Sequence, residues 1–143
     1  MEMIIVDASI AAKWFAPEPG SSDAMALAAS GREMQAPDFL LLEMDNVLWT
    51  WVRRGIIDRP IADAARERLR ESALRFHPFA PLLDVAYSIA NDTGASVYDA
   101  LYVALAEGLG VELVTADERL ARAVAGTRFA RRVVSLKDFA RRR

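Results

Sequence analysis

Four acidic side chains stand where the sequence predicts the end of a strand or the first turns of a helix: Asp7, Glu43, Asp99 and Asp117. In a layered α/β fold, the carboxyl ends of strands and the starts of helices face the same rim, where ligands bind. The four carboxylates are therefore expected to converge. The chain has no cysteine and one histidine, so the acids would form an all-oxygen site, which suits Mg²⁺ or Mn²⁺. Such a site can clamp a phosphodiester and activate a water for its hydrolysis.

Each acid, taken alone, also fits an ordinary structural role. Segments 96–99 and 115–118 both match the capping-box pattern that closes the start of a helix. Asp7 could cap the helix that follows it, and Glu43 could be a helix-surface residue. Caps need not converge, however, whereas these four acids are all predicted on one rim. Their convergence favours a shared site.

One buried helix and the strand after it position two of the acids. The helix is apolar nearly all round from Ala100 to Ala106, which is typical of a helix in the middle of a domain. Gly108 and Gly110 are expected to end it, and 111–115 reads as a short buried strand. Asp99 then lies in the first turn of the helix, and Asp117 lies just past the strand.

Glu43 lies in the longest predicted helix, about 7 Å beyond its expected cap, Asp38. On a helical wheel Glu43 falls at one edge of the apolar stripe, beside Val47, and Asp45 falls at the opposite edge. Glu43 is therefore the acid of this helix that is expected to look along the core boundary toward the rim.

The remaining elements alternate along the chain. Strands are predicted over 3–6, 33–36, 76–79, 111–115 and 132–136, and helices over 10–15, 21–30, 39–54, 59–75, 81–91 and 118–125. Three charge pairs on the helix over 59–75, such as Glu67 with Arg70, are expected to line a solvated face. Alternating short strands and helices indicate an α/β fold with a parallel sheet covered on both faces. We expect one domain over residues 1–143.

Composition excludes several classes of protein. With 53% hydrophobic residues and a mean hydropathy of +0.11, the chain is not expected to be disordered. No apolar run approaches the roughly 20 residues of a membrane span, and the acidic start does not resemble a signal peptide. Without cysteine, disulfides and thiolate metal sites are excluded. We expect a cytoplasmic protein with no membrane association.

Four segments that carry these acids resemble the motifs of the PIN-domain ribonucleases, and in particular the small VapC-type toxins of prokaryotic toxin–antitoxin pairs. The segments are Val6-Asp7-Ala8-Ser9, the block from Pro37 through Leu41-Leu42-Glu43 to Asn46-Val47-Leu48, Tyr98-Asp99-Ala100-Leu101-Tyr102-Val103-Ala104-Leu105-Ala106, and Val114-Thr115-Ala116-Asp117-Glu118-Arg119-Leu120. The likeness spans nearly the whole chain. Its ordered set of motifs is far more specific than any one acid.

The resemblance implies a PIN-like three-layer α/β/α fold with about five parallel strands, and Mg²⁺- or Mn²⁺-dependent cleavage of RNA. On the matching positions, Asp7, Glu43, Asp99 and Asp117 would be the acidic quartet, with Asp7 and Asp99 as direct metal ligands. It also implies a small antitoxin protein as partner, and we expect a homodimer.

The leading hypothesis is an endoribonuclease that uses a metal-held water for in-line attack and leaves a 5′-phosphate on one product. The alternative is a non-catalytic PIN-like module that binds RNA or protein, although a binder has no need to concentrate repelling acids. A third hypothesis, a phosphotransfer domain with a nucleophilic aspartate, lacks the second acid of a D-x-D motif at Asp7-Ala8-Ser9.

Other features are less specific. His77 precedes a proline on an expected edge strand, remote from the acids, and is interpreted as structural. Ser9 and Thr115 could hold waters or the scissile phosphate, or act as local caps. Lys13 and Arg119 could meet RNA phosphates or pair with the acids. The large aromatics of the first and third helices could be core or could line a groove for a partner helix: Trp14, Phe15, Trp49 and Trp51.

Overall fold

The structure is a computed structural model that describes residues 2–142. Five parallel strands form one sheet in the order β3-β2-β1-β4-β5. Their bounds are β1 (Met3–Val6), β2 (Glu33–Pro37), β3 (Arg75–His77), β4 (Glu112–Thr115) and β5 (Val133–Ser135). The α/β fold with a parallel sheet is therefore confirmed.

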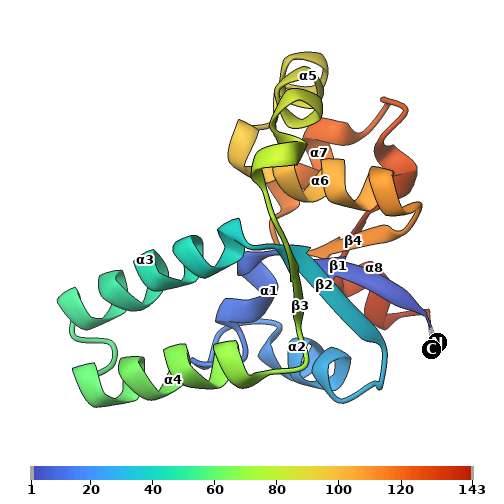
Figure 1. The fold of residues 1–143 in the computed structure, drawn as a ribbon. Helices are drawn as coiled ribbons and strands as arrows, with labels where there is room; N and C mark the ends of the chain where they lie inside the picture. Colours follow the sequence, from blue (N-terminus) through green and yellow to red (C-terminus); the bar gives the residue numbers. More distant parts are fainter. Residues whose placement is uncertain (1, 143) are drawn as a thin grey trace.

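Helices cover both faces of the sheet (Figure 1). On one face lie α5 (Leu83–Thr93), α6 (Val97–Leu109) and α7 (Glu118–Val124); on the other lie α1 (Ala8–Ala12), α2 (Ser21–Ala28) and α8 (Leu136–Ala140). Short 3₁₀ turns cover Ala80–Leu82 and Ala130–Arg132. No helix within residues 2–142 combines the length and the apolar character needed to cross a bilayer.

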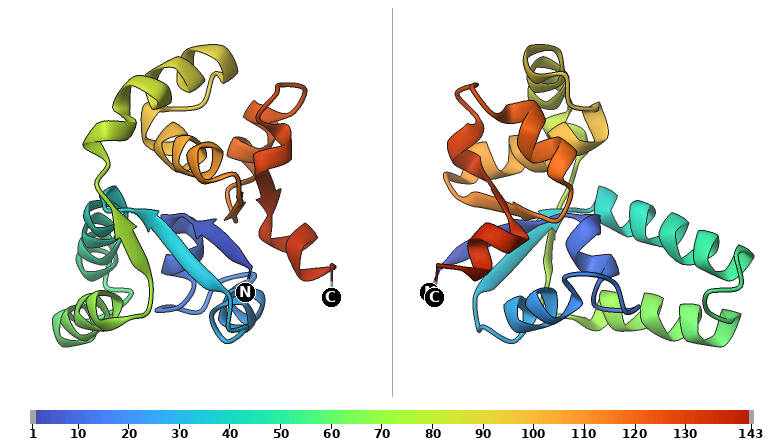
Figure 2. Two further views of the ribbon diagram at one scale, coloured as in Figure 1. Left: turned by 45° about the vertical axis from the view of Figure 1, so that its right-hand side comes forward. Right: turned by 180° about the vertical axis from the view of Figure 1, so that it is seen from behind.

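Two further helices form an arm that extends away from the sheet, as Figures 1 and 2 show: α3 (Phe39–Arg53) and α4 (Arg59–Glu71). A small apolar cluster of Leu48, Ala62 and Ala65 holds the two helices together. The first turn of α3 adjoins β2, so the start of the arm lies at the carboxyl edge of the sheet.

Helix α6 is the centre of the core, as expected from its sequence. It packs against β1, β2 and β4, and every residue from Ala100 to Ala106 is buried. Of the two glycines expected to end the helix, Gly108 lies within it and Gly110, whose φ of 68° is left-handed, caps it after Leu109. Gly110 accepts this conformation without the steric cost of a side chain.

Two other sequence expectations are corrected. Helix α4 ends at Glu71 because Arg75 already pairs with Gln35 in the sheet. The charge pairs expected along this segment do not form, since Arg66 and Arg70 turn to Asp45 on α3 and Arg75 turns to Glu33 on β2. After β5, α8 packs on α2 and buries Phe139.

Candidate functional site

The topology gives the sheet one switch point, between β1 and β4. The chain moves outward from β1 through β2 to β3, and then resumes on the other side of β1 with β4 and β5. Open α/β sheets bind ligands in the crevice at such a point, beyond the carboxyl ends of the strands. Asp7 directly follows β1 and Asp117 follows β4 by two residues. Both acids therefore flank the switch point.

Asp7 is buried, with 6% of its surface exposed, and both of its carboxylate oxygens are engaged. The Ser9 hydroxyl donates to Oδ1 at 2.5 Å, and the Thr115 hydroxyl donates to Oδ2 at 2.5 Å. The backbone N–H of Ile10 also donates to Oδ1 at 3.3 Å, so Asp7 caps α1. The cap and the convergent site thus use the same carboxylate.

Ser9 and Thr115 join the ends of β1 and β4. Besides holding Asp7, the Ser9 hydroxyl accepts from the backbone N–H of Ala116 at 2.9 Å, and the Thr115 hydroxyl accepts from that of Asp117 at 3.0 Å. The sequence indicated waters, phosphate or local caps for these hydroxyls; in the structure they orient Asp7. This role could have been predicted from the sequence, because both hydroxyls stand at or just past the ends of strands that were expected to be neighbours.

Glu43 points to the core boundary and Asp45 does not. The Tyr102 hydroxyl donates to Glu43 Oε1. Asp45 instead accepts two hydrogen bonds from Arg66, at 2.7 and 3.0 Å, and lies 3.6 Å from Arg70. Glu43 is thus the acid of α3 that is available to the site, as the helical wheel predicted. Sequence reasoning missed Tyr102, because it looks like one more apolar residue of a buried helix.

Asp99 and Asp117 begin their helices differently. The Ser96 hydroxyl caps α6 by accepting from the backbone N–H of Asp99 at 3.1 Å, and it also lowers the pKa of the Asp99 carboxyl. Asp117 is itself the cap of α7, accepting from the N–H of Arg119 at 2.9 Å. The capping box expected at Thr115 is therefore replaced by a cap at Asp117.

The electrostatics of the acids are coupled. Burial raises the pKa of Asp7 to about 6, although the Ser9 and Thr115 hydroxyls lower it, and the charge of Asp99 adds to the rise. Burial also raises the pKa of Glu43 to about 7, with further contributions from Asp7 and Asp99. The pKa of Asp99 is raised by burial and then by the charge of Asp117. The pKa of each of these three carboxyls is therefore raised in part by the charge of another acid.

The donor set fits a divalent cation by its chemistry, since carboxylates that destabilise one another would be relieved by a positive charge. As they are placed, however, the carboxylates do not form a complete set of metal ligands. Among residues 2–142, no three histidine, cysteine, aspartate or glutamate side chains stand close enough to enclose an ion as they are placed. Asp7 and Glu43 direct oxygens to hydroxyl donors instead, so an ion would draw the side chains inward.

The basic side chains that the sequence analysis singled out already have partners within the protein. Arg119 lies 3.5 Å from Asp117 and is 84% exposed, so it pairs with that acid while remaining open to solvent. Lys13 donates to the carbonyl of Pro19 at 2.8 Å and lies 4.0 Å from Glu18. His77 sits on the edge strand β3, hydrogen-bonded to Gln35, which agrees with its structural interpretation.

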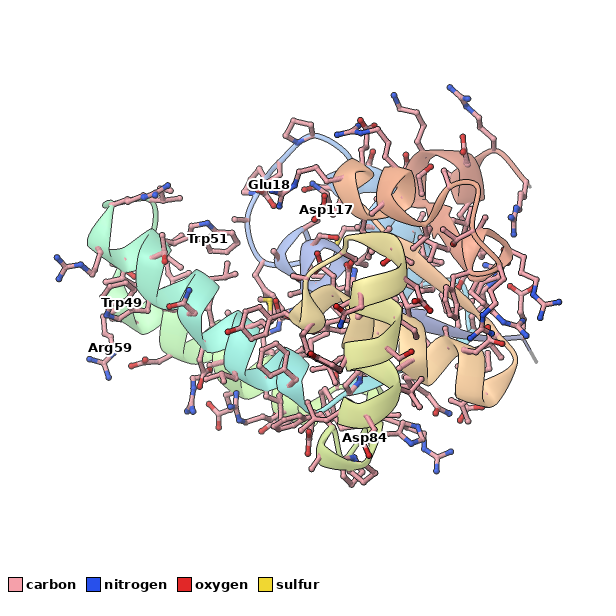
Figure 3. All side chains as sticks on the ribbon, turned by 90° about the horizontal axis from the view of Figure 1, so that it is seen from above. Glu18, Trp49, Trp51, Arg59, Asp84 and Asp117 are labelled. Atoms are coloured by element: carbon pink, nitrogen blue, oxygen red, sulfur yellow. The ribbon has the colours of Figure 1, made fainter. Side chains whose placement is uncertain are left out.

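A groove of about 330 Å³ lies beside the site. It is lined by Ser9 and Ala116, which neighbour the acids after β1 and β4, and by Val47 and Trp51 of α3. Figure 3 shows Trp51, Glu18 and Asp117 on the same side of the molecule, with Trp49 on the opposite edge of the arm. Trp14 and Phe15 are half-buried against the core, whereas Trp49 is 59% exposed. Of the four aromatics, Trp51 is therefore the one that faces this groove.

Comparison with known proteins gives consistent matches over most of the chain. The PIN domain family model matches residues 4–126. Ribonuclease VapC3 of Pyrobaculum aerophilum is 38% identical over 120 residues, which are 82% of this chain and 92% of that protein. Two solved structures share the fold at low identity. PAE2754 from Pyrobaculum aerophilum gives a TM-score of 0.73 at 22% identity, covering 99% of this chain and 96% of that one. A toxin–antitoxin complex from Klebsiella pneumoniae gives a TM-score of 0.64 at 16% identity, and the match covers 93% of this chain and 97% of that one.

Proposed function

This chain belongs to the PIN-domain family, and we propose that it is a metal-dependent endoribonuclease, the toxin of a toxin–antitoxin pair. The observation that carries the proposal is the coupling of four acids at the switch point of the sheet, two of them with pKa values raised to about 6 and about 7. A fold that served only as a scaffold would gain nothing from burying repelling carboxylates there. The proposal takes residues 1–143 as one PIN-like unit.

In this proposal Asp7 and Asp99 are direct ligands of Mg²⁺ or Mn²⁺, and Glu43 and Asp117 complete the quartet. The ion, when bound, supplies an activated water and neutralises charge on the phosphodiester. The protein supplies orientation: Ser9 and Thr115 fix the plane of the Asp7 carboxylate through its two oxygens. The guanidinium of Arg119, exposed beside Asp117, is placed to meet an RNA phosphate.

The direct test is incubation of the purified protein with mixed cellular RNA, with Mg²⁺ or Mn²⁺ and with EDTA. We expect fragments with 5′-phosphate ends in the presence of metal, and intact RNA with the chelator. Mapping of the product ends measures both the chemistry and the preferred sequence. RNA that binds the protein but stays uncut in every metal would support the binding-module alternative instead.

We also infer a small antitoxin as partner. The similar complex from Klebsiella pneumoniae is a toxin–antitoxin complex, and we place an added helix or extended segment of the antitoxin in the groove lined by Ala12, Val47 and Trp51. A basic side chain of that segment would approach the acids past Ser9 and Ala116, which line the groove next to Asp7 and Asp117 in the chain. Co-expression with the neighbouring small reading frame should yield a complex that co-purifies; a protein recovered alone would remove this part of the proposal.

We further predict a homodimer. Exposed apolar side chains lie at the starts of α3 and α6, where Leu42 is 63% exposed and Tyr98 stacks on Phe39 with 5.4 Å between ring centroids. Light scattering should give the mass of a dimer, and Leu42→Glu should shift it toward the monomer because a charge would be buried at the contact. Ile61→Glu, the same kind of change at a residue of α4 that is 51% exposed, is the matched control. A wild-type monomer at high concentration would contradict the prediction.

A further inference from the structure

Tyr102 is the one tyrosine of the three in the chain that lies inside the core. Only 1% of its surface is exposed, whereas Tyr87 and Tyr98 are both more than half exposed. It lies in the buried stretch of α6, from Ala100 to Ala106, where every other side chain is apolar. Its hydroxyl is therefore the single polar side-chain group of that stretch, and it donates to Glu43.

The two partners differ in how firmly they are held. Tyr102 belongs to a helix that packs against three strands, so its hydroxyl is a fixed point relative to the sheet. Glu43 lies in the second turn of α3, before the helix extends into the arm (Figure 1), and its own side chain is only half-buried. A half-buried glutamate on such a helix would otherwise turn to water, because burial penalises its charged form. The hydrogen bond thus holds the side chain of Glu43 at the core boundary.

The same helix carries another acid of the site. Asp99 and Tyr102 are three residues apart, and residues at that spacing lie on one face of a helix. One rigid element therefore presents Asp99 directly and, through the Tyr102 hydroxyl, also fixes the carboxylate contributed by α3.

We propose that Tyr102 is a positioning residue that sets the place of Glu43 in the metal-binding quartet, so that α6 determines two of the four acids. This role rests on the proposed function, because it assigns Glu43 to a metal site. Tyr102 touches neither substrate nor ion; it acts through Glu43. Outer-shell partners of metal ligands typically contribute about 10–100-fold in metal affinity or activity.

The test is Tyr102→Phe, which removes one oxygen and keeps the ring that fills the core. Bound and free Mn²⁺ are measured by electron paramagnetic resonance, and the melting temperature is measured in EDTA. We expect Mn²⁺ affinity to fall by about tenfold or more and kcat for RNA cleavage to fall in parallel, with KM for RNA nearly unchanged. The metal-free melting temperature should stay within a few degrees of wild type, because half-buried Glu43 can turn to water. Tyr87→Phe, the same change at an exposed tyrosine, should alter none of these quantities.

A double-mutant cycle separates positioning from general support of the core. In a Glu43→Gln background, Tyr102→Phe should cause little further loss of Mn²⁺ affinity, because the acid that it positions is already gone. An undiminished loss in that background, or a Tyr102→Phe protein equal to wild type in Mn²⁺ affinity and kcat, would overturn the role of Tyr102 alone. A wild-type protein that neither binds Mn²⁺ nor cuts RNA would overturn the proposed function and this role with it.

Discussion

Replacing Asp7 by asparagine is expected to lower RNA cleavage by about 10²–10³-fold or more, the range seen when a preorganised electrostatic group is removed from an active site. An amide cannot supply the charge that holds a divalent ion. It also presents an NH₂ group to one of the two hydroxyls that now donate to the carboxylate, those of Ser9 and Thr115. Initial rates with labelled RNA at saturating Mg²⁺ or Mn²⁺ measure the loss, and circular dichroism checks the fold.

His77→Ala is the matched control for that measurement. The imidazole lies on β3, hydrogen-bonded to Gln35 and away from the four acids, so turnover should remain within a few-fold of wild type. A loss of several orders of magnitude in folded His77→Ala would place the proton chemistry elsewhere. Full activity of folded, chelator-treated Asp7→Asn would exclude the metal mechanism.

The second large effect concerns stability and pH. In the metal-free protein the pKa of Asp7 rises from its ordinary 3.8 to about 6 and that of Glu43 from 4.5 to about 7. The folded state therefore binds more protons than the unfolded state between about pH 4 and pH 7, and the free energy of unfolding falls as the pH rises through that window. Below the unfolded pKa values the penalty is absent. For Asp7 alone it amounts to about 2–3 kcal/mol above pH 7.

Melts in EDTA should therefore show a melting temperature that is higher at pH 5 than at pH 8, by the order of 5 °C for a chain of this size. With saturating Mn²⁺ the melting temperature should instead be higher at pH 8 than at pH 5. The ion stabilises the folded state, and at low pH it must first displace the protons bound to the carboxylates. At 100 times its dissociation constant it would add about 2.7 kcal/mol. The gain from Mn²⁺ should consequently be larger at pH 8 than at pH 5.

Asp99→Asn distinguishes a repelling metal ligand from a simple helix cap. As a member of the quartet, Asp99 has a raised pKa, so at neutral pH the variant should melt higher than wild type in EDTA and gain nothing from Mn²⁺. If Asp99 acts only as a favourable charge at the start of α6, losing that charge would instead destabilise the fold by about 0.3–1 kcal/mol. A variant that melts lower in EDTA, beside a wild type that gains nothing from Mn²⁺, would mean that the acids are caps.

The sequence by itself determined the architecture and the edge on which the acids stand. Hydrophobic periodicity and glycine or proline breaks located all five strands, because a buried parallel strand is a short apolar run that local chemistry specifies. Asp7 and Asp117 follow such runs, so their place at the carboxyl edge followed from the chain alone. The failures were local too: the helix predicted over 59–75 ends at Glu71, because Arg75 begins strand β3 and pairs with β2.

Only the tertiary structure decided which groups hold the acids. The partners of Glu43, Asp45 and Asp7 come from 59, 21 and 108 residues away, respectively. A helical wheel fixes the face on which a side chain emerges, but the residue that it meets depends on how α6, α4 and β4 pack around it. Tyr102 reads as core and Thr115 as strand until packing places their hydroxyls against carboxylates. Long-range polar pairing depends on three-dimensional position, which no local period encodes.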